Sequence, residues 1–188
     1  VESIKSISIS EAEIRKRYKF TNIEEINKIE AANKSILLMC AHYGSWEWIF
    51  IIQRYVTTDG YAIYKKIENK YFDQLVRKIR AKYNTNLITN KETFTSMREH
   101  KRLGKKGIYG FLSDQSPKLK SAYHWRKFMN IKVPVHTGAE KLAKELDLAI
   151  VFFKTKKVKR GYYETTFKTV TLNPNEFENY QITDLFIN

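Results

Sequence analysis

Residues 36–41 (ILLMCA) form a continuous apolar run, short enough for a strand that is buried on both faces. The polar break at residues 42–45 follows, and Ser45 is suited to the cap of a helix. From Trp46 onward the apolar positions recur at helical spacing, with Ile49 and Phe50 on one face. The pattern therefore predicts a strand, a short loop and a helix in succession.

Similar alternation continues along the chain. Residues 1–34 have a polar helical pattern, and Ser10 with Glu13 fits a capping box. Strands are expected at 61–64, 86–89, 108–112, 148–154 and 162–172, and helices at 71–83, 92–103, 138–146 and from Asn173. Strands that alternate with helices predict an α/β fold with a mostly parallel central sheet, helices on both faces and an antiparallel edge.

Polar side chains follow three of the expected strands. His42, Lys65 and the pair Asp114-Gln115 each come directly after an apolar strand. Ligands of open α/β sheets bind outside the carboxyl ends of the strands, so these residues are candidates for one site. The alternatives are an exposed lysine at Lys65 and a turn or helix cap at Asp114-Gln115.

His42 and Glu47 could form a catalytic pair. In one continuous helix an offset of five would separate the two side chains, but a loop can fold His42 back onto a carboxylate in the first helical turn. A neutral imidazole accepts a proton near pH 7, and a carboxylate on its other nitrogen fixes the tautomer. Four histidines and 20 acidic residues give roughly 0.4 such pairs by chance, so a buried histidine bonded to backbone remains the alternative.

The composition indicates one globular domain over residues 1–188, with 43% hydrophobic and 29% charged residues. The single cysteine, Cys40, excludes an intramolecular disulfide framework and fits a reducing compartment. No run of 18 apolar residues and no signal-peptide pattern occurs. The four histidines lack metal-ligand spacing, so we expect neither a metal nor another cofactor.

The net charge of +14 calls for an acidic partner: nucleic acid, an anionic membrane surface or an acidic protein. Zinc-finger, RNP and KH patterns are absent, so nucleic acid is not expected. The basic run at residues 154–160 lies between two apolar alternating segments, and we expect it at a hairpin tip.

The segment around His42 resembles the His-x4-Glu (or Asp) block of the lipid A biosynthesis (late) acyltransferases, a family of the lysophospholipid acyltransferase superfamily. That block has the form His-x-Gly-x-Trp-Glu, which His42, Gly44, Trp46 and Glu47 match. Further blocks resemble the family in the same order, so the likeness covers most of the chain. They are Tyr64-Lys65 with Asn69, Asp114-Gln115 with Pro117, and Phe128-Met129 with Pro134 and the Ala- and Lys-rich segment after it.

Some positions depart from the family pattern. Lys65 stands for an arginine, which keeps the charge and loses the bidentate fork. Asn84 and Asn130 stand where the family has glycine, and asparagine tolerates the left-handed backbone. We expect a single acyltransferase domain that lacks the family's N-terminal membrane anchor and its C-terminal tail.

The resemblance implies a glycerolipid acyltransferase-like fold and transfer of a fatty acyl group from an acyl-carrier-protein or CoA thioester to a hydroxyl of a lipid A precursor. It gives His42 the role of general base and Glu47 that of its orienter. Gly44, Lys65, Asp114 and Gln115 are then candidates for substrate binding or site support. The implied location is the cytoplasmic face of the bacterial inner membrane, in contact with its anionic surface.

Three alternatives stay open. The acceptor could be another lipid, such as an aminolipid or a lysophospholipid. The chain could be a non-catalytic protein that binds anionic lipid or nucleic acid, although an idle protein would have no need of His42 and Glu47. A thiol hydrolase based on Cys40 is the weakest, since a cysteine inside an apolar strand packs as a small hydrophobe.

Overall fold

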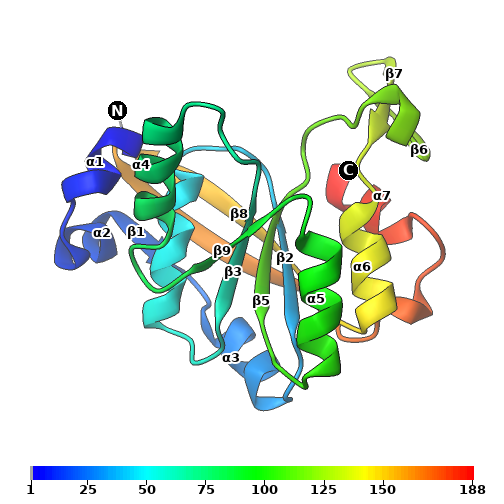
Figure 1. The fold of residues 1–188 in the computed structure, drawn as a ribbon, viewed down its shortest axis with the longest axis horizontal. Coiled ribbons are helices and arrows are strands. Elements are labelled where there is room, and N and C mark those ends of the chain that lie inside the picture. Colours follow the sequence, from blue (N-terminus) through cyan, green and yellow to red (C-terminus); the bar gives the residue numbers. More distant parts are fainter. Residues whose placement is uncertain (1) are drawn as a thin grey trace.

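The computed structural model describes residues 2–188 and contains a twisted seven-stranded sheet with helices on both faces (Figure 1). Every neighbouring pair of strands is parallel except β8 and β9. The spatial order is β1 (Tyr18–Phe20), β9 (Tyr162–Thr171), β8 (Ala149–Lys159), β2 (Ile36–Cys40), β5 (Ile108–Leu112), β3 (Gly60–Tyr64) and β4 (Asn86–Thr89). The predicted α/β class is therefore confirmed.

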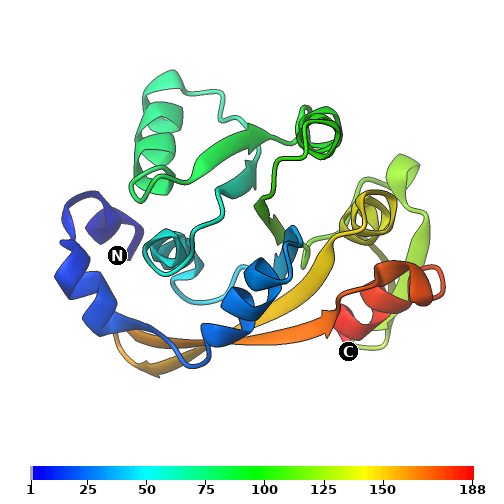
Figure 2. The same ribbon diagram turned by 90° about the horizontal axis from the view of Figure 1, so that it is seen from below.

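Two groups of helices cover the sheet. One face packs against α2 (Glu11–Arg17), α3 (Glu24–Ala31) and the 3₁₀ helix η1 (Trp46–Arg54), and the other against α5 (Thr93–Arg102), α6 (Gly138–Leu146) and α7 (Gln181–Ile187). Figure 2 shows α1 (Glu2–Ser8) and α2 at one end of the molecule, and α6 and α7 at the other. The remaining helices are α4 (Lys70–Arg80), η2 (Leu119–Ser121) and η3 (Pro174–Glu176).

Strand β2 runs through the middle of the core. Its side chains at Ile36, Leu38 and Cys40 enter one hydrophobic cluster, and those at Leu37 and Met39 enter the other. All five are at most 4% exposed, as the continuous apolar run predicts. Burial of such a side chain contributes about 1.5–3 kcal/mol to the stability of the fold. The position of β2 is therefore strongly held, and with it the point where the following loop begins.

Several boundaries differ from the sequence prediction. The helix at Trp46 is 3₁₀ rather than α, and residues 18–20 leave the helical pattern to form β1, parallel to β9. Strand β8 extends to Lys159, so most of the basic run 154–160 is strand and not hairpin tip. The last helical segment is divided into η3 and α7.

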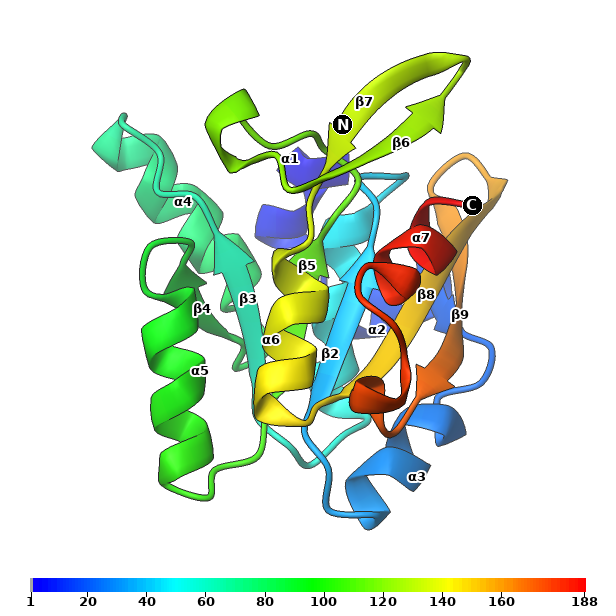
Figure 3. The same ribbon diagram turned by 90° about the vertical axis from the view of Figure 1, so that its right-hand side faces the viewer.

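A separate hairpin was not predicted from the sequence. Strands β6 (His124–Phe128) and β7 (Ile131–Val135) pair with each other alone, and they project beyond the end of the main sheet in Figure 3. Their pattern mixes lysine, arginine and aromatic residues without a clean alternation, because neither face of the hairpin is fully buried.

Candidate active site

The register of the central strands brings His42 and Asp114 together. Cys40, the last residue of β2, pairs with Leu112, the last residue of β5. His42 and Asp114 each lie two residues beyond these strand ends. The Ser113 amide donates to the Cys40 carbonyl at 3.0 Å, which extends the ladder into the two loops. The strand ends therefore position these two loops against each other.

Both oxygens of the Asp114 carboxylate contact His42. The ring Nδ1 lies 2.7 Å from Oδ1, and the backbone N–H of His42 donates to Oδ2 at 3.0 Å. The side chains are 34% and 31% exposed, so solvent or a substrate can reach them. Among residues 2–188 no hydrogen bond engages Nε2 of His42, which leaves this nitrogen available for a substrate.

The Asp114 carboxyl is held in its ionised form. Burial opposes its ionisation, but the hydrogen bonds from the ring and the backbone of His42 outweigh this effect and keep the pKa of Asp114 below its usual value. An ionised acceptor on Nδ1 favours the tautomer that carries its proton there and its lone pair on Nε2.

Glu47 has a different partner from the one predicted. Its Oε1 accepts from Nε and from a terminal nitrogen of Arg80, each at 3.2 Å, and the two side chains are 14% and 17% exposed. Within the described chain no hydrogen bond joins Glu47 to His42, so the predicted contact is replaced by His42–Asp114. The physical reason is that the first turn of η1 carries Glu47 toward α4, whereas β5 delivers Asp114 to the loop.

Arg80 connects Glu47 to the neighbourhood of His42. The guanidinium lies over the Trp46 ring at 5.1 Å from its centroid, and the Trp46 and His42 rings pack edge to face with their centroids 5.4 Å apart. Glu47 is thus linked to His42 indirectly, through its ion pair with Arg80 and the contact of Arg80 with Trp46. No local sequence pattern distinguishes Arg80 from the other basic residues of α4.

Gly44 is required by the shape of the loop. Its φ is +61°, and a Cβ at this position would lie 2.9 Å from the Tyr163 ring. Ser45 occupies the cap position of η1, as predicted, although its side chain forms no capping hydrogen bond. Asn84 and Asn130 adopt φ values of 70° and 64°, which agrees with the expectation that asparagine takes the left-handed backbone there.

The other candidates lie at the same end of the sheet. Lys65 follows β3, is exposed, and makes no ion pair in the part of the chain that the structure describes. Gln115 is exposed beside Asp114. Cys40 is only 4% exposed, and burial raises the pKa of its thiol, so the thiolate of a cysteine hydrolase is disfavoured.

A small apolar cavity of about 50 Å³ lies between the sheet and η1. Leu38, Ala62 and Gly110 line it from the strands, and Ile49 and Phe50 line it from η1. Trp46 and Arg80 also border this cavity, and Trp46 is the residue whose edge meets His42. The cavity is therefore adjacent to the histidine.

A wide groove begins on the other side of Asp114. It runs along the exposed face of β8 and β9, where Lys154, Lys156 and Lys168 line it without an ion pair among the described residues. Phe128 and Phe186 contribute apolar surface to the same groove. The site thus has a small apolar cavity on one side and, on the other, a larger groove whose surface is mostly apolar and carries three lysines.

Within residues 2–188, no cluster of three or more histidine, cysteine, aspartate or glutamate side chains has the arrangement of a metal site. No helix in the same residues has the length and apolar character needed to cross a membrane.

Comparison with protein-family models gives a match. The family model described as bacterial lipid A biosynthesis acyltransferase matches residues 1–186, nearly the whole chain. No curated protein sequence matches significantly.

Proposed function

The chain belongs to the bacterial lipid A biosynthesis acyltransferase family, and we propose that it transfers a fatty acyl group from an acyl-carrier-protein or CoA thioester to a hydroxyl of a lipid A precursor. The family establishes an acyltransferase that acts on a lipid. The observation that carries the finer proposal is the His42–Asp114 pair, in which Asp114 lines the groove and Nε2 of His42 has no hydrogen bond among residues 2–188.

His42 acts as the general base. Its Nε2 removes the proton from the acceptor hydroxyl as the hydroxyl oxygen attacks the thioester carbonyl. The tetrahedral intermediate then collapses, the carbon–sulfur bond breaks, and the imidazolium returns the proton to the leaving thiolate. The products are an ester and a free thiol, and no acyl-enzyme is formed. Asp114 positions the ring and stabilises its transient positive charge.

Glu47 serves the site as a positioning residue. Its bond to Arg80 holds the guanidinium over Trp46, and Trp46 in turn limits the movement of the His42 ring. The role suggested for Glu47 by the sequence, as direct orienter of His42, passes to Asp114 in this proposal.

The two hollows suit the two substrates. The cavity next to Trp46 is lined by aliphatic and aromatic side chains, the surroundings that an acyl chain requires. The groove offers Lys154, Lys156 and Lys168, which suit phosphate groups of an acceptor. We therefore assign the end of the donor chain to the cavity and the acceptor to the groove. In this proposal the enzyme works at the anionic cytoplasmic face of the inner membrane.

The test is acyl transfer by the chain from radiolabelled acyl-carrier protein to a lipid A precursor, a lysophospholipid and an aminolipid in parallel. We expect label in the lipid A precursor and its loss in His42→Ala. Label in another acceptor would show that the acceptor is a different class of lipid, and the proposed acyl-transfer mechanism would stand. Transfer by His42→Ala at the wild-type rate would contradict the mechanism, and an inactive wild type would favour the binding-protein alternative.

The partner of His42 is tested in the same assay. We expect Asp114→Asn to reduce kcat strongly and Glu47→Gln to reduce it less. If Glu47→Gln abolishes transfer while Asp114→Asn does not, Glu47 is the partner of His42 in catalysis.

A further inference from the structure

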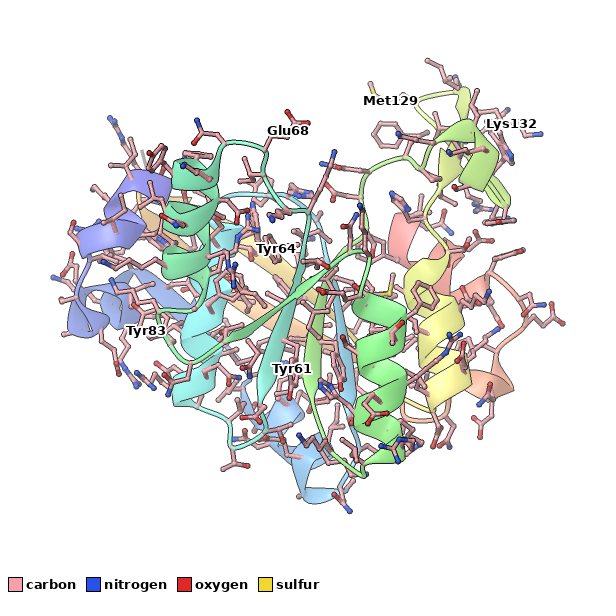
Figure 4. The ribbon with its side chains drawn as sticks, in the orientation of Figure 1. Tyr61, Tyr64, Glu68, Tyr83, Met129 and Lys132 are labelled. Atoms are coloured by element: carbon pink, nitrogen blue, oxygen red, sulfur yellow. The ribbon has the colours of Figure 1, made fainter. Side chains whose placement is uncertain are left out.

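The tip of the β6–β7 hairpin carries large apolar side chains that nothing in the described chain covers. Phe128, Met129 and Ile131 are 61%, 83% and 66% exposed. Single exposed apolar residues are ordinary on protein surfaces, but three within four positions at the end of a projecting hairpin form an apolar tip. Figure 4 shows Met129 and Lys132 at the outer end of this projection.

The turn itself does not explain these residues. Met129 and Asn130 have φ values of 49° and 64°, the conformation in which turns favour asparagine and glycine. Asparagine suits it, but methionine is disfavoured at positive φ and gains no packing inside the molecule in return. Packing within the described chain therefore does not account for a methionine at this position.

The segment that leads into the hairpin has the same character. Leu119 of η2 and Tyr123 are 75% and 73% exposed. In Figure 3 this segment and the hairpin lie together at the end of the molecule where β3 and β5 end, which is also the end that carries His42 and Asp114. The exposed apolar residues therefore lie at the same end of the molecule as His42 and Asp114.

The charge around the tip has one sign. From residue 115 to residue 139 the sequence contains no acidic residue and five basic ones, Lys118, Lys120, Arg126, Lys127 and Lys132. Arg126 is bound to Asp184, and none of the four lysines forms an ion pair in the described part of the chain. Lysines placed behind an apolar tip are complementary to anionic headgroups above an acyl layer.

The hairpin is held firmly to the body at its base. His124 Nε2 lies 2.7 Å from Asp184 of α7, Arg126 Nε lies 3.3 Å from the same carboxylate, and the His124 ring stacks on Tyr180 at 4.6 Å. Because of these contacts, a surface that binds the tip also fixes the orientation of the His42–Asp114 end of the molecule relative to that surface.

We propose that the β6–β7 tip, with Leu119 and Tyr123 beside it, is a membrane-docking surface. Met129, Ile131 and Phe128 enter the interfacial layer of an anionic bilayer while Lys127 and Lys132 contact its headgroups. This inference rests on the proposed function, because an enzyme whose acceptor is a lipid must reach that lipid in a bilayer. A carrier protein would match the charge of this surface but would leave the apolar tip in water.

A labelled variant reports the insertion directly. Cys40 is buried, so a thiol-reactive nitrobenzoxadiazole label reacts selectively with Met129→Cys. We expect its emission to shift to shorter wavelength on addition of vesicles of phosphatidylethanolamine and phosphatidylglycerol. The same label on Leu103→Cys, at the carboxyl end of α5 and 49% exposed, should not respond. Equal responses, or none at Met129→Cys, would overturn the proposal.

A second measurement uses variants that retain the turn. Met129→Asn with Ile131→Thr keeps a residue suited to positive φ and a β-branched strand residue, so the hairpin should fold normally. In vesicle sedimentation we expect its affinity to fall about tenfold, the loss expected when two apolar side chains no longer enter the interface. Leu103→Ser is the matched control and should bind like the wild type.

Charge is tested separately from apolar contact. Lys127→Glu with Lys132→Glu should weaken binding to the phosphatidylglycerol vesicles and have little effect on phosphatidylcholine vesicles. Unchanged sedimentation of both double variants would refute the docking surface.

Failure of this inference can be told from failure of the proposed function. With an acceptor dispersed in detergent, Met129→Asn/Ile131→Thr should transfer acyl groups at the wild-type rate. A chain that docks through the tip but transfers nothing would keep the docking surface and refute the catalytic proposal. A chain that transfers normally but never shows tip insertion would do the reverse.

Discussion

At the scale of single residues, the partner of His42 decides how the site works. The Asp114 carboxylate forms hydrogen bonds with both the ring Nδ1 and the backbone N–H of His42. Because the pKa of this carboxyl is lowered, Asp114 is a charged acceptor throughout the neutral pH range. Glu47 instead forms an ion pair with Arg80.

We therefore expect Asp114→Asn to lower kcat by about 10³-fold with little change in KM, because the ring is no longer held in its active tautomer. Steady-state kinetics measures the split, and ¹⁵N NMR of the labelled imidazole should show loss of the Nδ1–H tautomer preference. An increase in KM with unchanged kcat would indicate that Asp114 only binds substrate.

Gly44 is the second residue whose identity is set by the site. We expect Gly44→Ala to lower the free energy of unfolding by about 2 kcal/mol, because the left-handed backbone costs roughly 1–2 kcal/mol and the Tyr163 ring must move. Denaturant unfolding measures this. Gly138→Ala is the control, since it lies in α6 with open space around its Cβ, and it should be neutral or slightly stabilising.

At the scale of elements, a buried carboxylate attaches α7 to α6. Glu140 is 3% exposed and accepts hydrogen bonds from the Tyr180 and Thr183 amides at 2.7 and 2.8 Å and from the Thr183 hydroxyl at 2.7 Å. Lys144 lies 3.0 Å away as its counter-ion. This attachment supports the base of the β6–β7 hairpin, because Asp184 of α7 binds His124.

Glu140→Gln should therefore destabilise the protein by about 3 kcal/mol, since the amide nitrogen cannot accept the hydrogen bonds of the oxygen it replaces and Lys144 loses its counter-ion while it keeps its bonds to the Phe177 and Glu178 carbonyls. Glu145→Gln on the same helix is the control, because its ion pair with Arg98 is on the surface and should change stability by less than about 1 kcal/mol. Equal effects in thermal or denaturant unfolding would show that the carboxylate of Glu140 is dispensable.

At the scale of the whole molecule, layers that are distant in the sequence enclose the apolar cavity. Strands β2, β3 and β5 form its floor and η1 forms its roof. Gly110 lies in the floor, and a Cβ built there approaches no atom closer than 3.8 Å, so a side chain at this position can grow into the empty space.

We expect Gly110→Val to shift donor preference toward shorter acyl chains by about tenfold in kcat/KM, the scale on which a filled pocket distinguishes methylene groups. Competition between labelled thioesters of different length measures the shift, with Gly110→Ala as a mild control. An unchanged length profile would place the acyl chain elsewhere.

Much of the fold could be predicted from local pattern. The apolar run at residues 36–41 and the alternating segments predicted β2, β3, β4, β5, β8 and β9 within a few residues, because a buried strand requires such side chains. The family blocks indicated His42, Gly44 and Asp114 as site residues, and the glycine-like positions Asn84 and Asn130 have positive φ. The β6–β7 hairpin escaped prediction because its exposed apolar tip and lysines give no periodic signal.

The sequence by itself determined the α/β class, the family and the end of the sheet that carries the candidate site, because these depend on periodicity and on short sequence blocks. Only the tertiary structure decided which carboxylate contacts His42. Asp114 is 72 positions away and reaches it through the β2–β5 register, whereas Glu47, five positions away, is turned toward Arg80 by η1. Pairing between strands fixes contacts that spacing along the chain cannot specify.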